Sequence, residues 1–310
     1  MIKKIFISKK PVSGPWGGGN KFVNGLINTC VNNNIEVVFD LSSSNIDVIF
    51  CFDPRPNSLG LSYYDYQNYK KKNSHTKIVQ RVGDIGTHSK PDLFKLVNKT
   101  SRISDFVIFP SEWSRKMLSY EKNNFIIVPN APDEIFYKNR SKNYKINKKS
   151  INIITHHWSD NPKKGFDVYS LLGQMIVEKK LNASFTYVGR YNNAFSSKGI
   201  KIIEPQDKES LAKLLPENDI YLTASLEEAG ANHVLEALAC GLPILYRKDG
   251  GSIEEYCEPY GISYDHNLNA LLQGLEKIVD NFENIKDSCL KYQNTLDSCV
   301  LKYWEIICKI

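Results

Sequence analysis

Residues 228–243 read EAGANHVLEALACGLP and lie between two short apolar runs, at 219–223 and 243–246. The two runs fit strands. The apolar residues between them recur at helical spacing from about Ala231, and Gly241 with Pro243 just beyond it is typical of a helix end. A strand, a helix and a second strand in this order form one unit of a parallel sheet. Gly230 and its neighbours then form the turn at the helix N-terminus, where free backbone N–H groups attract phosphates and polar ligand oxygens.

Apolar runs of the same kind recur along the whole chain. In the first half they cover residues 5–7, 36–39, 47–50, 77–79, 106–109 and 125–128, and in the second half 151–154, 184–188, 200–203, 219–222 and 243–246. Apolar runs separated by crossover-sized segments indicate parallel strands that are buried on both faces. Two such series predict an α/β protein with two parallel sheets.

A polar, lysine-rich stretch from Asp133 to Ser150 separates the two series and is typical of a linker. The stretch from about residue 267 to residue 310 has helical apolar spacing and predicts two or three helices. We therefore expect a first domain at 1–135, a linker at 136–149, a second domain at 150–290 and a C-terminal helix at 291–310.

The composition excludes several classes of protein. The chain has 310 residues, of which 42% are apolar, so it is neither disordered nor collagen-like. No apolar run approaches the ~18 residues of a membrane-spanning helix, and residues 1–4 lead directly into a strand pattern, which predicts no signal peptide. The seven cysteines are odd in number and include no CxxC pair, so we expect reduced thiols and a cytoplasmic protein.

The net charge of +6 is unevenly distributed. Residues 1–150 contain 24 Lys and Arg against 12 Asp and Glu, whereas residues 151–310 contain 16 against 22. A basic half fits an anionic membrane surface, an acidic glycan or nucleic acid as a partner. A lysine-rich surface that is simply solvated is the alternative. We expect no nucleic-acid partner, because the chain has no RNA-binding aromatic signature.

Glu228 and Glu236 have the spacing Glu-x7-Glu, and ALACGLP follows the second glutamate. On spacing alone, an amphipathic helix with solvated glutamates fits as well as a ligand site. Together, however, the two features resemble the donor-site motif of retaining family-4 glycosyltransferases with the GT-B fold, and the resemblance runs from about residue 151 to residue 265. It implies two Rossmann-like domains that face each other across a cleft, with the last helix crossing back to the first domain.

The resemblance also assigns roles within the motif. Glu228 contacts the hydroxyls of the donor sugar, and Glu236 holds the ribose of the nucleotide. The backbone at Gly230, Ala231 and Asn232 faces the sugar and the phosphates.

The loop after the strand at 151–154 contains Lys163, Lys164 and a glycine. Taken alone, such a loop is ordinary surface. By resemblance, Lys164 is the lysine that binds the diphosphate, where a cation stabilises charge on the leaving group. The family usually has an arginine five positions before this lysine, but this chain has Ser159. Lys163 and Arg190 are the candidates for the second cation.

Three further loops match the family by position. Pro205 follows a strand where the family places backbone contacts to the nucleobase, and residues 249–252 resemble a short glycine loop. Gly18 and Gly19 belong to a glycine-rich segment, PWGGGNK at 15–21, that follows the first strand. This segment does not satisfy the dinucleotide pattern Gly-x-Gly-x-x-Gly, and it resembles the loop that the family places under the donor phosphates.

The segment RVGDIGTH at 81–88 supplies Asp84 and His88, which the resemblance places on the acceptor side. For Asp84, the cap of a helix N-terminus is the alternative role. Ser111 is expected to be a structural cap. The candidate catalytic residues are therefore Lys164, Glu228 and Asp84.

The chain contains no Asp-x-Asp, the usual carboxylate pair that holds a metal against a nucleotide diphosphate, and His156 and His157 have no clustered further ligands in the sequence. The resemblance thus implies metal-independent glycosyl transfer with retention and no cofactor. A UDP-sugar is favoured over a GDP-sugar as donor, and the acceptor is a glycan or a lipid-linked glycan in polysaccharide biosynthesis. The charge suggests a peripheral enzyme at the inner membrane face. A nucleotide-sugar 2-epimerase of the same fold and an inactive sugar-nucleotide binder are the alternatives.

Overall fold

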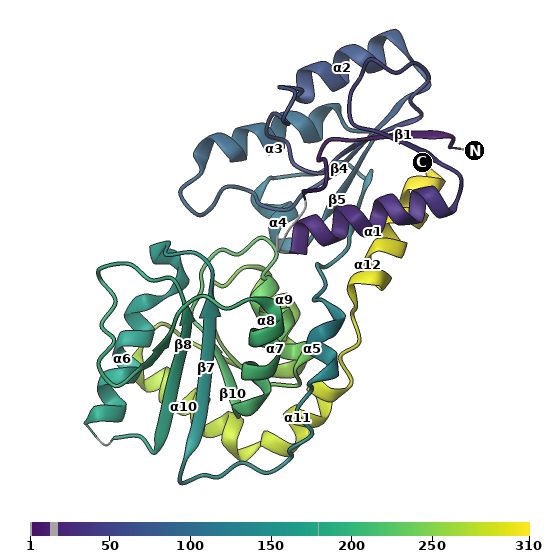
Figure 1. The fold of residues 1–310 in the computed structure, drawn as a ribbon. Coiled ribbons are helices and arrows are strands. Elements are labelled where there is room, and N and C mark those ends of the chain that lie inside the picture. Colours follow the sequence, from purple (N-terminus) through teal and green to yellow (C-terminus); the bar gives the residue numbers. More distant parts are fainter. Residues whose placement is uncertain (1, 13–17, 179) are drawn as a thin grey trace. The chain divides into compact units, whose positions relative to one another are not determined.

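The computed structural model describes residues 2–12, 18–178 and 180–310. Its contacts divide the chain into two compact units. Unit 1 comprises residues 1–130 and 295–310, and unit 2 comprises residues 131–294. Each unit contains a parallel six-stranded sheet with helices packed on it, which confirms the predicted α/β class (Figure 1).

The sheet of unit 1 has the strand order β2-β1-β3-β4-β5-β6. Its strands are β1 (Lys4–Ile7), β2 (Glu36–Val38), β3 (Val48–Cys51), β4 (Lys77–Arg81), β5 (Phe106–Phe109) and β6 (Phe125–Ile127). Its helices are α1 (Gly18–Asn32), α2 (Tyr63–Lys72), α3 (Pro91–Ile103), α4 (Glu112–Met117) and α12 (Leu296–Lys309). Strands β1, β3, β4 and β5 consist almost entirely of buried residues, as expected of a sheet covered on both faces.

The C-terminal helix α12 lies against α1 in unit 1 (Figure 1). The ring of Tyr303 meets that of Phe22 edge to face, with 4.7 Å between their centroids. Gly25 of α1 lets the two helices approach closely, because a Cβ there would lie 3.1 Å from a methyl carbon of Val300. Residues far apart in the sequence therefore share one apolar core.

The sheet of unit 2 has the order β12-β11-β10-β7-β8-β9. Its strands are β7 (Ile151–His157), β8 (Ala183–Gly189), β9 (Lys201–Ile203), β10 (Ile220–Thr223), β11 (Ile244–Arg247) and β12 (Gly261–Tyr264). Its helices are α5 (Glu134–Lys138), η1 (Pro162–Lys164), α6 (Phe166–Val177), α7 (Lys208–Leu214), η2 (Leu215–Glu217), α8 (Asn232–Ala239), α9 (Ser252–Cys257), η3 (Glu258–Tyr260), α10 (Leu268–Asp280) and α11 (Phe282–Leu290).

Two apolar cores enclose this sheet. Successive strand residues point to opposite faces, so Ile153 packs in the core with α6 and α10, whereas Ile154 packs in the core with α8. In the same way, Ile220 packs in the core with α6 and α10, and Tyr221 packs in the core with α8. Burial on both faces explains why the strands appear in the sequence as unbroken apolar runs.

The polar segment after Asp133 is tied to unit 2. It contains the short helix α5, in which Phe136 is 2% exposed. The guanidinium of Arg140 donates to the backbone carbonyls of Ala239, Leu290 and Tyr292, at 2.9, 2.7 and 2.7 Å. These bonds satisfy carbonyls at the C-terminal ends of α8 and α11.

No helix among the described residues has the length and apolar character needed to cross a membrane.

Candidate active site

The loops after β7 and β10 leave the sheet of unit 2 at its topological switch point. Strand β7 lies beside β10, but the chain continues from β7 to β8 and β9 on one side and from β10 to β11 and β12 on the other. In open α/β sheets, the loops diverge at such a point and leave a crevice beyond the carboxyl ends of the strands. Lys163 and Lys164 follow β7, and Glu227 and Glu228 follow β10.

Gly165 allows these two loops to touch. Its φ of +84° lies in the left-handed region, and a Cβ there would lie 2.3 Å from the Cβ of Ala224, just after β10. Asn161 begins the short helix η1 by accepting a bond from the Lys163 N–H at 3.0 Å, and the Leu226 N–H donates to the Lys163 carbonyl at 2.9 Å. The backbone therefore fixes both lysines against the β10 loop.

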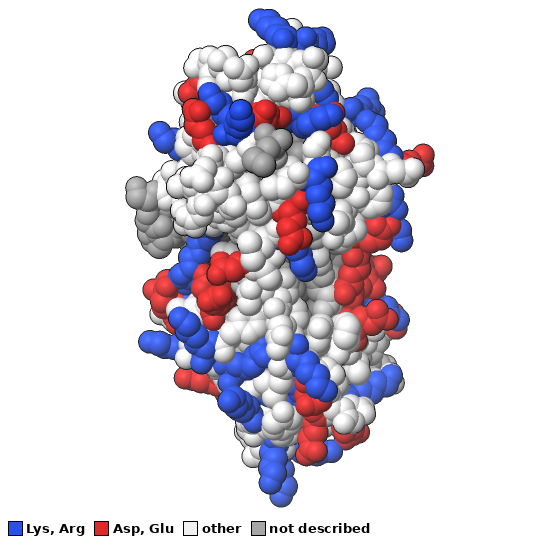
Figure 2. Space-filling model, turned by 90° about the vertical axis from the view of Figure 1, so that its right-hand side faces the viewer, with Lys and Arg blue, Asp and Glu red and all other residues white. Residues whose placement is uncertain are grey.

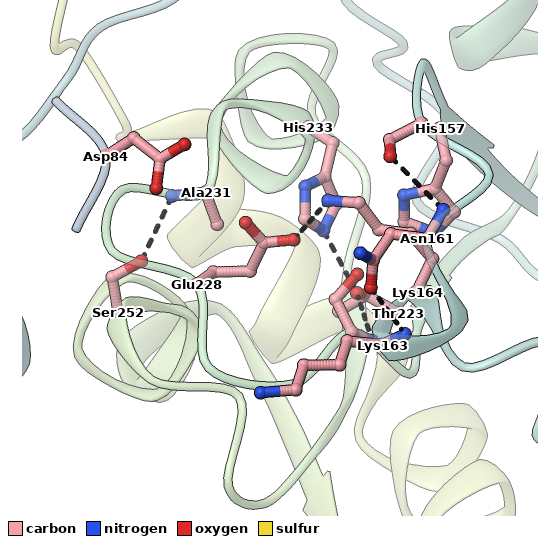
Figure 3. Close-up of polar contacts among 12 residues, drawn as sticks. Asp84, His157, Asn161, Lys163, Lys164, Thr223, Glu228, Ala231, His233 and Ser252 are labelled. Carbon is pink, nitrogen blue, oxygen red and sulfur yellow. Dashed lines mark hydrogen bonds and ion pairs between the residues drawn. The ribbon is translucent and has the colours of Figure 1, made fainter. Parts of the chain in front are cut away.

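Each lysine pairs with one of the glutamates. Lys164 Nζ lies 2.5 Å from Glu228 Oε1, and the two side chains are only 12% and 14% exposed (Figure 3). Lys163 Nζ bonds to Glu227 Oε2 in a more exposed pair. The predicted diphosphate-binding lysine and the predicted sugar-binding glutamate are thus brought together within one unit.

The loop that contains Glu228 is braced by the glycine loop after β11. Glu227 and Asp249 have φ values of +52° and +64°, which non-glycine residues rarely adopt, and the Glu227 N–H donates to the Asp249 carbonyl at 3.0 Å. Next to them, the Glu228 N–H donates to the Gly250 carbonyl, also at 3.0 Å. The Ala231 N–H, which the sequence analysis assigned to the sugar and phosphates, donates to Ser252 Oγ at 3.0 Å (Figure 3).

Glu236 lies on α8 and accepts a hydrogen bond from His156 of β7. The distance between His156 Nε2 and Glu236 Oε2 is 2.8 Å, and the side chains are 11% and 26% exposed. The hydroxyl of Tyr221 lies 3.1 Å from His156 Nδ1. Both glutamates of the Glu-x7-Glu motif therefore bond to residues at the end of β7 or in the loop after it.

Three buried histidines lie close together behind this edge. The ring centroids of His157 and His233 are 5.0 Å apart, and those of His156 and His233 are 6.3 Å apart. His157 Nε2 bonds to the Tyr169 hydroxyl at 2.8 Å, and His233 Nε2 bonds to Thr223 Oγ1 at 3.0 Å. Within the described part of the chain, no group of three or more His, Cys, Asp and Glu residues is arranged to hold a metal ion.

The candidates for a second cation have other contacts. The Arg190 guanidinium lies over the ring of Trp158, 4.3 Å from its centroid, and Lys163 is paired with Glu227. Ser159, where the family has arginine, accepts a bond from the Asn161 N–H at 3.2 Å and helps to shape the lysine loop.

The remaining predicted donor positions lie in loops. Gly230 precedes α8, Asn232 is its exposed first residue, and Pro205 is half-buried between β9 and α7. In unit 1, Gly18 begins α1, and a Cβ on Gly19 would lie 3.2 Å from the Phe52 ring. Residues 15–17 of the predicted glycine-rich segment lie outside the described residues.

Asp84 of unit 1 holds a turn and an ion pair. Its carboxylate accepts bonds from the Gly86 N–H and from Lys90 Nζ, both at 2.8 Å. Burial raises the pKa of Asp84, but the bonds from Lys90 and Gly86 outweigh burial and hold the pKa below its ordinary value. Asp84 is not a helix N-cap, because the N-cap of α3 is Lys90. Ser111, in contrast, is confirmed as the N-cap of α4, where it accepts a bond from the Ser114 N–H.

Two residues that build this site, Glu227 and Tyr221, were not singled out in the sequence, and Ser252 was named only as part of a glycine loop. Two consecutive lysines and two consecutive glutamates can be seen in the sequence. That they form pairs follows only from the strand order, which places β7 beside β10. His156 was considered only as a metal ligand, and its position at the end of a strand was the available signal.

Comparison with known proteins finds a family that matches part of the chain. Residues 159–288 match the family model described as glycosyl transferases group 1. A probable sucrose-phosphate synthase of Thermosipho melanesiensis is 26% identical over 207 residues, which cover 59% of this chain and 47% of that protein. The chain thus matches about half the length of this curated relative.

Solved structures show a similar fold at low sequence identity. Sucrose-phosphate synthase from Thermosynechococcus elongatus superposes with a TM-score of 0.68 at 12% identity, covering 100% of this chain and 99% of that chain. HepE of Anabaena, in complex with UDP-glucose, gives a TM-score of 0.64 at 13% identity and covers both chains fully, at 100%. The resemblance found in the sequence is thereby confirmed: residues 159–288 match the model of the group 1 glycosyltransferases, and the chain has the GT-B fold.

Proposed function

We propose that this protein transfers a sugar from a nucleotide-sugar donor to a hydroxyl of a glycan or lipid-linked acceptor, with retention at the anomeric carbon and without a metal. The observation that carries the proposal is the pair of Lys164 and Glu228 at the switch point of unit 2, with Glu236 two helical turns further on. A shielded cation beside two carboxylates matches a ligand that has both a diphosphate and hydroxyls.

Lys164 supplies the electrostatic part of catalysis. An ammonium group has three N–H donors, so Lys164 can keep its bond to Glu228 and still donate to a phosphate oxygen. Because the pair is largely shielded from water, its charge acts more strongly on the leaving diphosphate than an exposed lysine would. Glu228 then accepts hydrogen bonds from sugar hydroxyls and orients the anomeric carbon.

The proposed reaction requires no protein nucleophile. The bond between the anomeric carbon and the phosphate oxygen breaks, and the acceptor oxygen bonds to that carbon on the same face. The departing phosphate takes the acceptor's proton. Glu228 is poorly suited to attack the carbon, since its carboxylate is already bonded to an ammonium group.

UDP is the proposed nucleotide. HepE holds UDP-glucose, and the pneumococcal O-GlcNAc transferase GtfA, with a TM-score of 0.60, holds UDP and GlcNAc. Starch synthase IV of Arabidopsis thaliana, with a TM-score of 0.57, holds ADP. Glu236, which His156 holds, is the proposed ligand of the ribose, and all of these nucleotides have a ribose, so the thermal-shift screen described below identifies the base.

We also propose an anionic surface as the setting of the acceptor. Unit 1, counted with its C-terminal helix, has 20 Lys and Arg against 12 Asp and Glu, a net charge of +8, whereas unit 2 has 20 against 22. Basic and acidic side chains are interspersed on the face shown in Figure 2. A groove of about 430 Å³ in unit 1, lined by Lys95, Lys99 and Arg102 of α3 and by Met117, combines positive charge with apolar surface. The net charge of unit 1 and its basic groove both favour a peripheral enzyme at an anionic membrane.

The test of the donor site is a thermal-shift screen against UDP, GDP, ADP, CMP and their common sugars, with and without EDTA. A ligand that binds only the folded state raises Tm by mass action, so no acceptor is needed. We expect a UDP compound to raise Tm equally with and without EDTA, and Glu236→Ala to abolish the increase. Absence of any shift would reduce the proposal to a statement about the fold.

Turnover distinguishes the alternatives. Transfer requires an acceptor, epimerisation of the donor sugar does not, and an inactive binder shows affinity without either product. Lys163 pairs with Glu227, and Arg190 lies over Trp158, so Lys164 is the cation proposed to act on the diphosphate and turnover is expected to be slow. NMR is the method of choice, because it detects a slowly formed product and also reports its anomeric configuration.

A further inference from the structure

His156 is the side chain that holds Glu236 in place. Glu236 Oε2 lies 2.8 Å from His156 Nε2, and no other hydrogen bond to this carboxylate occurs among the described residues. Its second oxygen, Oε1, therefore remains available to a ligand. Since Glu236 is 26% exposed and His156 only 11%, the histidine lies on the protein side of the carboxylate.

Tyr221 sets the hydrogen-bonding state of His156. A carboxylate only accepts hydrogen bonds, so Nε2 of His156 carries the proton that it shares with Glu236. In the neutral ring, Nδ1 is then an acceptor, and the Tyr221 hydroxyl lies 3.1 Å from it, with the His156 carbonyl oxygen at 3.3 Å as the other acceptor within its reach. The same hydroxyl accepts from the His156 backbone N–H at 3.2 Å, so the tyrosine is itself held in position.

Among the described residues, Glu236 is the only hydrogen-bond partner of His156 Nε2. The titratable groups that face the ring are Glu236 and His233 from α8 and Tyr221 from β10. His233 Nε2 bonds to Thr223, and the ring centroids of His156 and His233 are 6.3 Å apart. The Nε2–H of His156 is thus directed to Glu236.

We propose that His156 is a positioning residue for nucleotide recognition: with Tyr221 it fixes the Glu236 carboxylate so that Oε1 accepts from a ribose hydroxyl. The inference rests on the proposed function and deepens it. Without His156, the carboxylate rotates freely and must be ordered when the ligand binds, so affinity falls even though Glu236 is still present.

The experiment compares a nucleoside diphosphate with its 2′,3′-dideoxy counterpart, by calorimetry on the full chain. UDP, GDP, ADP and CDP are screened, and the tightest binder is used for every variant. The variants are Glu236→Gln, His156→Leu and His156→Gln. Glutamine places an amide nitrogen four bonds from Cα, as histidine does with Nε2, and retains the donor. Tyr221→Phe removes the hydroxyl behind Nδ1, and His157→Leu is the control for losing a buried histidine from β7.

We expect the wild type to prefer the ribonucleotide by about tenfold or more, the value of a hydrogen bond to a charged group. Glu236→Gln and His156→Leu should each remove most of this preference and leave affinity for the dideoxy ligand nearly unchanged. His156→Gln should restore most of it. Tyr221→Phe should lower the preference about two- to fivefold, and His157→Leu should lower Tm without changing the preference. In turnover, His156→Leu should raise KM more than it lowers kcat.

The outcomes separate the two proposals. Loss of the ribose preference in Glu236→Gln but not in His156→Leu overturns the role of His156 and leaves the donor site intact. Two outcomes overturn the donor site and with it this inference. In the first, Glu236→Gln keeps the full preference for the ribonucleotide over the dideoxy ligand. In the second, folded wild type binds none of the four nucleotides. Equal loss of affinity for both ligands in His156→Leu, without rescue by glutamine, reduces His156 to a structural residue.

Discussion

Lys164 Nζ and Glu228 Oε1 lie 2.5 Å apart although the two residues are 64 positions apart in the sequence, and both side chains are nearly buried. Removing two charges from water offsets most of their attraction, so a shielded pair contributes little net stability. Its effect is on position: each partner holds the other at the carboxyl edge of the sheet. A ligand with a diphosphate and sugar hydroxyls offers a new partner to both groups.

Replacing Lys164 by methionine should reduce kcat strongly. The aliphatic stem is kept but the cation beside the leaving diphosphate is lost, which typically costs about 10²- to 10³-fold. Steady-state kinetics with the identified donor measures the effect, and the Tm shows whether Glu228, left without its partner, destabilises the fold. Lys163→Met is the matched control, because it removes the neighbouring ammonium from a more exposed pair and should cost less than about tenfold. Equal losses would contradict the role assigned to Lys164.

Gly165→Ala should be one of the most destabilising single changes in unit 2. The new Cβ would lie 2.3 Å from the Cβ and 2.5 Å from the carbonyl oxygen of Ala224, in addition to the strain of a φ of +84°. We expect a loss of about 3 kcal/mol or more in the free energy of unfolding, measured by urea denaturation. Gly60→Ala is the control: Gly60 has a similar φ of +76° with nothing within 4 Å, so only the backbone strain of about 1 kcal/mol applies. Similar losses of unfolding free energy in both variants would show that the new Cβ at position 165 is accommodated without a steric penalty.

Lys286 should make stability depend on pH. It is 1% exposed, and burial lowers the pKa of its ammonium group to about 8, while Nζ donates to the Gly241 carbonyl at 2.7 Å. Between pH 8 and the ordinary value of 10.5, the unfolded chain binds more protons at this site than the folded chain. Its contribution to the free energy of unfolding therefore rises with pH, by about 1 kcal/mol between pH 7 and pH 9.

The measurement is the difference between wild type and Lys286→Met in urea denaturation at pH 7 and at pH 9. Burial raises the pKa of the buried cysteine thiols, which lowers stability as pH rises. Both proteins share these groups, so the subtraction removes the effect of the thiols that Lys286 does not influence; Lys286 lowers the pKa only of Cys240 and Cys289. If the difference in unfolding free energy between wild type and Lys286→Met is the same at pH 7 and at pH 9, Lys286 has an ordinary pKa.

The sequence was sufficient to predict strands β1 to β11, because parallel strands are buried on both faces and appear as apolar runs. Strand β12 was missed, since residues 261–264 read GISY and include glycine and serine at an edge of the sheet. Helix α5 was also missed within the polar segment, because its single buried anchor, Phe136, gives no periodicity. The motif residues Glu228, Glu236 and Lys164 were found by resemblance. Their partners depend on β7 lying beside β10, and no local pattern reports strand order.

The basic groove of unit 1 gives the last prediction. Lys95, Lys99 and Arg102 of α3 are exposed and line the groove together with Met117. Replacing all three by serine should weaken co-sedimentation with vesicles of anionic lipid by up to about 100-fold, since each basic residue near such a surface contributes about 1 kcal/mol. The control replaces exposed Lys142, Lys145 and Lys149 of unit 2, which is the same change in charge at another place. Binding that is indifferent to anionic lipid, or equally weakened by both triple variants, would show that this groove is not the membrane contact. Selective loss would instead locate the acceptor side of the enzyme at α3, because a lipid-linked acceptor is reached only from the surface that carries it.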